Sequence, residues 1–188
     1  DALLIKPLEL FKNHPEVLKN YQKKYKQVMV DEFQDTNRLQ MKLIRSLVQS
    51  HGNIAVVGDD DQSIYGWRGA VIANILNFPK EFKNCKVVCL ETNYRSTKSI
   101  LNVANSVIQK NKKRHKKTLL PAHSENSVHK PEVFTYETDE EEIEEVISQI
   151  RHFKNLGFRL DETSVLYRSN SQGALLEASL RTHNIPYV

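Results

Sequence analysis

The sequence predicts an α/β fold with a largely parallel sheet. Short β-branched runs alternate with longer segments whose apolar residues recur at helical spacing, which is typical of strand–helix–strand units. Hydrophobic residues make up 39% and charged residues 27% of the 188-residue chain, a balance that supports a buried core and argues against extensive disorder. This length fits one ordinary domain or two small ones.

Three strands are predicted in the first half of the chain, at residues 27–30, 54–57 and 86–90. Helical pieces precede the first strand, and a helix that starts near Leu39 and ends near Gly52 separates the first two strands. A short helix is expected after the second strand and ends around Pro79. A further helix follows the third strand, with the apolar residues Ile100, Leu101, Ala104, Val107 and Ile108.

The second half begins with a polar segment, residues 111–130, that we expect to be an exposed loop. Thr138 is a candidate N-cap with Glu141 three residues on, as in a capping box. The acidic residues that follow Thr138 suit the first turns of a helix and need no catalytic role. A strand at 163–167, a helix at 171–183 and a strand at 185–188 complete the predicted elements.

Charge and cysteine content narrow the possible classes of protein. The net charge of +4 is compatible with nucleic-acid binding but is weak evidence for it. No apolar run approaches the roughly 20 residues of a membrane span, and no secretory leader is visible, so we expect a cytoplasmic protein. In a strand, Cys85 and Cys89 would lie about 13 Å apart, too far for a disulfide, so we expect free thiols, one or both of them buried.

Adjacent carboxylates, Asp31 and Glu32, follow the first predicted strand. Ligands of α/β sheets bind at the carboxyl ends of strands, where one carboxylate can hold Mg²⁺ and its neighbour can activate water. For such a pair alone, a strand that simply runs into a helix N-cap is the more common explanation. Asp35, Thr36 or Asn37 would then be the cap.

A second polar segment, residues 58–70, follows the next strand and is expected at the same sheet edge. There the amide of Gln62 could reach a phosphate. Tyr65 and Trp67 stand beside Arg68, a combination that suits base stacking on single-stranded nucleic acid, although the tryptophan could equally fill a core. The carboxylates at 59–61 would repel DNA and are expected to shape the turn or to pair with basic residues.

A third segment, residues 90–97, places Tyr94 and Arg95 after the third strand. An arginine offers a planar, permanently charged fork for a phosphate, and a tyrosine offers a face for a purine. Together, the three segments resemble motifs II, III and IV of superfamily 1 DNA helicases of the UvrD/Rep/PcrA type. The resemblance runs from about Tyr25 to Val188.

The resemblance implies parts of two RecA-like domains, residues 1–92 and 93–188, and a function in ATP-driven movement 3′ to 5′ on single-stranded DNA with duplex unwinding. By resemblance, Asp31 would hold Mg²⁺ and Glu32 would activate water. Gln62 would sense the γ-phosphate of ATP, Tyr94 would stack on adenine, and Arg95 would be an arginine finger.

The resemblance also implies DNA contacts for Tyr65 and Trp67, and a less defined role for Arg68. It further implies that the protein binds single-stranded DNA and its junctions with duplex DNA. Roles in DNA repair and replication would follow from that binding. None of the six glycines precedes a lysine, so the Walker A loop is absent and the isolated chain is expected to be inactive. A degenerate, non-catalytic DNA-binding or adaptor module, or a piece of a helicase–nuclease subunit, remain as alternatives.

Overall fold

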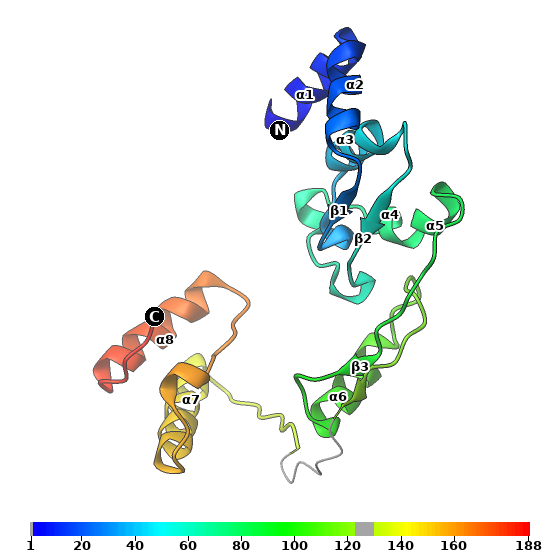
Figure 1. Cartoon of the computed structure of the whole chain (residues 1–188). Coiled ribbons are helices and arrows are strands. Elements are labelled where there is room, and N and C mark those ends of the chain that lie inside the picture. Colours follow the sequence, from blue (N-terminus) through cyan, green and yellow to red (C-terminus); the bar gives the residue numbers. More distant parts are fainter. Residues whose placement is uncertain (1, 123–129) are drawn as a thin grey trace. The chain divides into compact units, whose positions relative to one another are not determined.

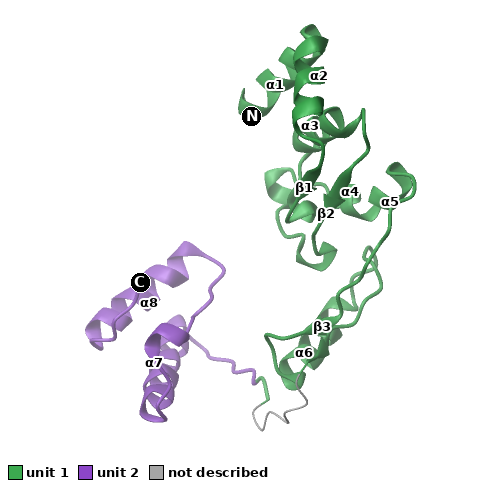
Figure 2. Cartoon of the chain, viewed as in Figure 1, with its two compact units in different colours: residues 1–131 green, residues 132–188 purple. Residues whose placement is uncertain are grey.

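The computed structural model describes residues 2–122 and 130–188, which form helices joined by short strands and turns (Figure 1). The chain divides into two compact units, Asp1–Pro131 and Glu132–Val188 (Figure 2). Within the described residues, no helix is long and apolar enough to cross a membrane. The division into residues 1–92 and 93–188 stays a prediction.

The first two predicted strands are present and parallel. β1 (Val28–Val30) pairs with β2 (Ile54–Val56), with Val28 opposite Ile54 and Val30 opposite Val56. α3 (Arg38–Val48) connects them, as its apolar periodicity predicts. The N-cap of α3 is Asn37, which exchanges hydrogen bonds with Gln40 in a capping box.

A small core holds this part of the first unit together. It is built from four buried side chains: Phe33, Met41, Ile44 and Phe78. Phe33 and Phe78 meet edge to face, with ring centroids 5.3 Å apart. Because Phe33 follows Glu32 directly, this core fixes the turn that carries the carboxylates. α1 (Ala2–Asn13) and α2 (Pro15–Lys24) precede β1, as the helical pieces predict.

Three short elements separate β2 from the next part of the unit. They are the 3₁₀ turns η2 (Asp60–Gln62) and η3 (Gly66–Arg68) and the helix α4 (Ala73–Leu76). α5 (Phe78–Glu81) then begins with Pro79 in its first turn, so this proline starts a second short helix after α4 has ended.

The predicted strand at 86–90 is wrong: these residues form no regular element, and Val87 and Val88 are exposed. A strand needs a neighbouring strand for its backbone hydrogen bonds. In this part of the chain the described strand pairing begins only at Thr92. β3 (Thr92–Asn93) pairs in parallel with β4 (Leu120–Pro121), with α6 (Lys98–Ile108) between them. Both described ladders are therefore parallel, but each has only two short strands.

The second unit is a pair of helices around its own core. Thr138 is the N-cap of α7 (Asp139–Asn155) as predicted, because the Glu141 amide donates to Thr138 Oγ1 at 3.2 Å. The predicted capping box is incomplete, because Glu141 Oε2 accepts the Glu137 amide and not that of Thr138. The 3₁₀ turn η4 (Leu160–Glu162) leads toward α8 (Asn170–Thr182). The buried core residues are Ile147, Ile150, Leu176 and Leu180. The strands predicted at 163–167 and 185–188 are wrong, since neither segment pairs with a described strand.

Both cysteines are free thiols, as predicted. The expectation that one or both of them are buried is wrong, because Cys89 is exposed and Cys85 is only half-buried beside the Phe78 core. The exposure of Cys89 follows from the missing strand at 86–90, because an unpaired segment covers neither of its faces.

Candidate functional site

The paired carboxylates lie where the sequence places them, at the carboxyl end of β1. Asp31 and Glu32 are both exposed. Glu32 has a left-handed backbone, with φ of 47°, and its amide donates to Asp31 Oδ1 at 2.9 Å. A non-glycine residue in this conformation costs about 1–3 kcal/mol and needs support from its surroundings. Here the Phe33 amide supplies it by donating to the Val57 carbonyl at 3.0 Å, which ties the turn to β2.

Gln34 joins this turn to the segment that follows β2. Its side chain is buried, with 1% of its surface exposed. Its Nε2 donates to Glu32 Oε2 at 2.8 Å, and its Oε1 accepts the Asp59 amide at 2.9 Å. A buried amide that satisfies partners on two loops fixes the position of both.

Sequence reasoning assigned Gln34 no role. Its only signal is its place inside the segment 31–36, beside the two carboxylates.

Gly58 provides the space that Gln34 occupies. A Cβ at this position would lie 2.6 Å from Gln34 Oε1, 3.0 Å from Ile75 Cδ1 and 3.1 Å from the Phe33 amide nitrogen. Two of these neighbours belong to packed core or backbone, so neither can retreat at low cost.

We expect Gly58→Ala to destabilise the fold by about 1–3 kcal/mol, the usual cost of overpacking. The measurement is the midpoint of thermal unfolding. The matched control is Gly66→Ala, because a Cβ at Gly66 would meet nothing within 4 Å. Equal midpoints for the two variants would show that the Gln34 contact tolerates displacement.

Gln62 ends the turn η2 and is exposed. Its Nε2 donates to Asp59 Oδ2 at 2.7 Å, so its amide is held beside the residue whose own backbone bonds Gln34. The structure therefore links Glu32 to Gln62 through Gln34 and Asp59.

Tyr65, Trp67 and Arg68 form an exposed aromatic cluster at η3. The Arg68 guanidinium lies 4.6 Å from the Trp67 ring centroid and 5.1 Å from that of Tyr65. Trp67 is 74% exposed, so it does not fill a core. A solvated indole beside a cation offers a face on which a nucleobase can stack.

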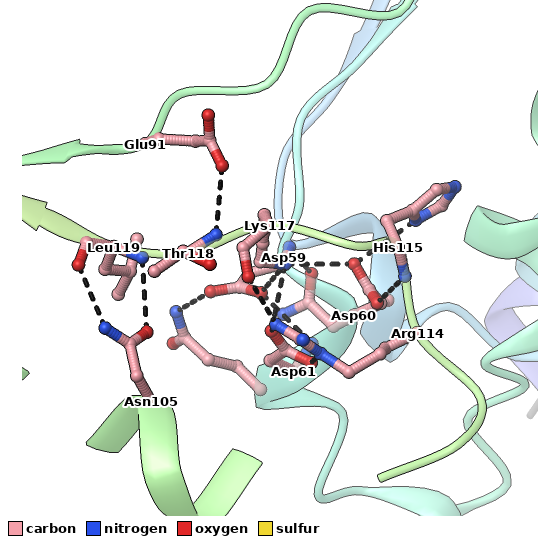
Figure 3. A network of polar contacts seen from close by, with 12 residues as sticks. Asp59, Asp60, Asp61, Glu91, Asn105, Arg114, His115, Lys117, Thr118 and Leu119 are labelled. Atoms are coloured by element: carbon pink, nitrogen blue, oxygen red, sulfur yellow. Dashed lines mark hydrogen bonds and ion pairs between the residues drawn. The ribbon is translucent and has the colours of Figure 1, made fainter. Parts of the chain in front are cut away.

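The carboxylates at 59–61 pair with basic residues, as predicted, and the partners come from residues 114–117 (Figure 3). Burial raises the pKa of Asp59, but hydrogen bonds from Lys117 and Gln62 outweigh burial and hold this pKa below its ordinary value. Burial lowers the pKa of Lys117, but hydrogen bonds to Asp59 and Asp60 raise it above its ordinary value. These groups therefore stay charged at neutral pH.

The exposed loop predicted at 111–130 is only partly correct. Arg114 and Lys117 are largely buried in these ion pairs, whereas Lys112, Lys113 and Lys116 are exposed. Residues 123–129 of that predicted loop lie outside the described residues.

Tyr94 and Arg95 follow β3 directly and are exposed. Asn93 Oδ1 accepts the amides of Arg95 and Ser96, at 3.0 and 2.8 Å, which shapes the turn between β3 and α6. In the part of the chain that the structure describes, the Arg95 side chain makes no hydrogen bond or ion pair, so none joins it to Asp31 or Glu32.

A hollow of about 490 Å³ lies beside the carboxylates, between β1 and α3. Asp31, Glu32 and Asp35 contribute carboxylates to its lining, and Asp35 Oδ1 is buried without a hydrogen-bond partner among the described residues. Mg²⁺ in nucleotide sites keeps several waters and takes one or two carboxylates together with phosphate oxygens. The exposed Asp31 carboxylate fits that donor set.

Two family models match this chain. The model for the UvrD/REP helicase N-terminal domain matches residues 1–83, and the model for the UvrD-like helicase C-terminal domain matches residues 88–188. The chain belongs to the UvrD-like helicase family. The resemblance found in motifs II to IV is thereby confirmed.

Curated relatives of this family match the whole chain. The ATP-dependent DNA helicase PcrA of Staphylococcus epidermidis is 43% identical over 187 residues, and that of Staphylococcus aureus is 43% identical over 189 residues. The chain spans 25% of the length of these relatives. The roles assigned to the individual site residues stay predictions.

Proposed function

We propose that this chain is the central part of a cytoplasmic, ATP-dependent DNA helicase that moves 3′ to 5′ along single-stranded DNA and unwinds duplexes at junctions. The observation that carries the proposal is the link from Glu32 through Gln34 and Asp59 to Gln62. It joins a carboxylate suited to activating water and an amide suited to sensing phosphate. Family membership and relatives described as ATP-dependent DNA helicases support it.

In this proposal Asp31 and Glu32, at the end of β1, have separate roles in metal binding and proton transfer. Asp31 would bind Mg²⁺, which supplies charge neutralisation for the phosphates of ATP when bound. Glu32 would accept the proton of the attacking water. Because Gln34 donates to Glu32 Oε2, that oxygen has a fixed position, and the other carboxylate oxygen is left to receive the proton.

Gln62, Tyr94 and Arg95 would complete the nucleotide site. Gln62 would contact the γ-phosphate. Its position would then depend on whether the phosphate is bound, and this change would reach the aromatic cluster of Tyr65, Trp67 and Arg68, which begins three residues later. Tyr94 would stack on adenine, and Arg95 would stabilise charge on the transferred phosphate in the transition state. The missing Walker A loop means that the isolated chain would not turn over ATP.

Stacking on Trp67 makes a specific prediction for DNA binding. In the complete protein encoded by the gene that contains this sequence, Trp67→Ala should weaken binding of single-stranded DNA by about 5- to 150-fold, the equivalent of ~1–3 kcal/mol for one stacked base. Fluorescence anisotropy of a labelled oligonucleotide at fixed salt measures the affinity.

Tyr25→Ala is the matched control. Tyr25 is also an exposed aromatic below a cation, with Lys24 Nζ 5.4 Å from its ring centroid, but it precedes β1 at the opposite end of the strand from the site. A loss of affinity no greater for Trp67→Ala than for Tyr25→Ala would remove the aromatic cluster from the proposed DNA path.

A further inference from the structure

Two segments far apart in sequence are joined by a network of ion pairs, residues 59–61 after β2 and residues 114–117 before β4 (Figure 3). Arg114 donates from Nε and Nη2 to both oxygens of Asp61, each at 2.7 Å. Lys117 Nζ donates to Asp60 Oδ1 at 3.0 Å and is ion-paired with Asp59 and Asp61 as well. The His115 amide donates to Asp60 Oδ2 at 2.7 Å.

These charges are largely removed from solvent. The side chains of Arg114 and Asp61 are 10% and 11% exposed, and those of Lys117 and Asp60 are 13% and 3% exposed. Exposed ion pairs contribute little and are easily exchanged, whereas breaking one partner of a buried pair leaves an uncompensated charge. The network therefore fixes the position of residues 114–117 relative to residues 59–61.

The residues that directly follow the basic segment 114–117 bond to the part of the unit that carries Arg95. Thr118 donates its amide to Glu91 Oε1 at 2.9 Å, and Asn105 of α6 bonds both the amide and the carbonyl of Leu119. The next two residues, Leu120 and Pro121, form β4 on β3. β3 ends at Asn93, immediately before Tyr94 and Arg95.

The acidic segment is fixed just as directly to the other side of the proposed nucleotide site. Asp59 accepts hydrogen bonds from both Lys117 Nζ and Gln62 Nε2, and its amide donates to Gln34, which bonds Glu32. Because Lys117 and Gln62 both donate to the Asp59 carboxylate, a displacement of Lys117 would shift the position of the Gln62 amide.

We propose that Arg114 and Lys117 are positioning residues that couple the turn bearing Gln62 to the turn bearing Tyr94 and Arg95. This inference rests on the proposed function and adds a strap, residues 114–121, between two of its motifs. The strap transmits the relative position of the two turns, so its loss lowers the rate of the chemical step and leaves nucleotide affinity almost unchanged. If these basic residues only covered the surface, their loss would change neither the rate of the chemical step nor the nucleotide affinity.

The test is a charge swap in the complete protein. Arg114→Asp and Asp61→Arg, made singly, should each lower the DNA-stimulated kcat for ATP hydrolysis roughly tenfold, with KM for ATP within about twofold of wild type. The double variant, which restores the pair with its charges exchanged, should recover most of the rate. Lys116→Ala is the control, because Lys116 is exposed and makes no ion pair within the described residues.

Unchanged turnover in both folded single variants, or no recovery in a folded double variant, would overturn the inference. Hydrogen exchange provides a second measurement that needs no turnover. The amides of Asp61 and Gln62 should be protected in wild type and should lose protection in the conservative variant Lys117→Gln. Free exchange of these amides in wild type would also overturn the inference.

Failure of the proposed function is a different result. Wild-type protein that does not hydrolyse ATP contradicts the function, whatever the exchange of these amides. Turnover that depends on Glu32 but not on Arg114 contradicts the strap alone.

Discussion

Arg95→Ala in the complete protein should lower DNA-stimulated ATP turnover by about 10³- to 10⁵-fold, the range in which an arginine finger acts. The guanidinium would contact the phosphate only as charge develops, so its loss raises the barrier to the chemical step. Arg95 suits this role because its backbone is held by Asn93 while its side chain is exposed and makes no hydrogen bond or ion pair among the described residues. Single-turnover kinetics at saturating ATP measures the effect.

Two variants make the test of Arg95 specific. Arg95→Lys keeps the charge but loses the planar fork, so most of the defect should remain. Arg151→Ala, at an exposed arginine of α7, should leave turnover unchanged. Turnover by Arg95→Ala within threefold of wild type would contradict a role for Arg95 in the transition state.

The second large effect is expected for Glu32→Gln, which should reduce ATP turnover by about 10²- to 10⁴-fold. The substitution removes the group that accepts the proton of water and preserves side-chain size. The amide oxygen of glutamine can still accept the hydrogen bond from Gln34, so the turn should keep its shape. Affinity for a non-hydrolysable ATP analogue should therefore remain close to that of wild type.

Glu140→Gln, at an exposed carboxylate of α7, serves as the control for a general change of charge. Comparable turnover for Glu32→Gln and wild type would show that another group activates water. A parallel loss of analogue affinity would instead indicate that Glu32 holds the site together.

Local patterns predict the structure around the site well. The apolar runs that end in acidic residues become β1 and β2, and the polar residues after Thr36 supply the Asn37 cap. The cap depends on residues three positions apart, and the two strands are separated only by α3, so they pair with the next strand along the chain. The pairing of the carboxylates at 59–61 with basic residues is also correct, because three adjacent carboxylates need cations when they are buried.

Features that depend on distant partners are the ones that sequence reasoning misses. The apolar runs at 86–90, 163–167 and 185–188 suit strands, yet none has a described strand beside it. Gln34 is buried because Gly58 and Asp59, from the segment after β2, close over it. The basic residues of the predicted loop at 111–130 have the composition of a solvated surface, and only their partners at 59–61 determine that Arg114 and Lys117 are buried.

The most direct measurement is the rate of ATP hydrolysis by the complete protein, with and without single-stranded DNA. The proposal predicts magnesium-dependent hydrolysis that single-stranded DNA stimulates and that Glu32→Gln lowers by about 10²- to 10⁴-fold. A folded complete protein that binds single-stranded DNA but hydrolyses no ATP under either condition would contradict it and would identify a non-catalytic DNA-binding module.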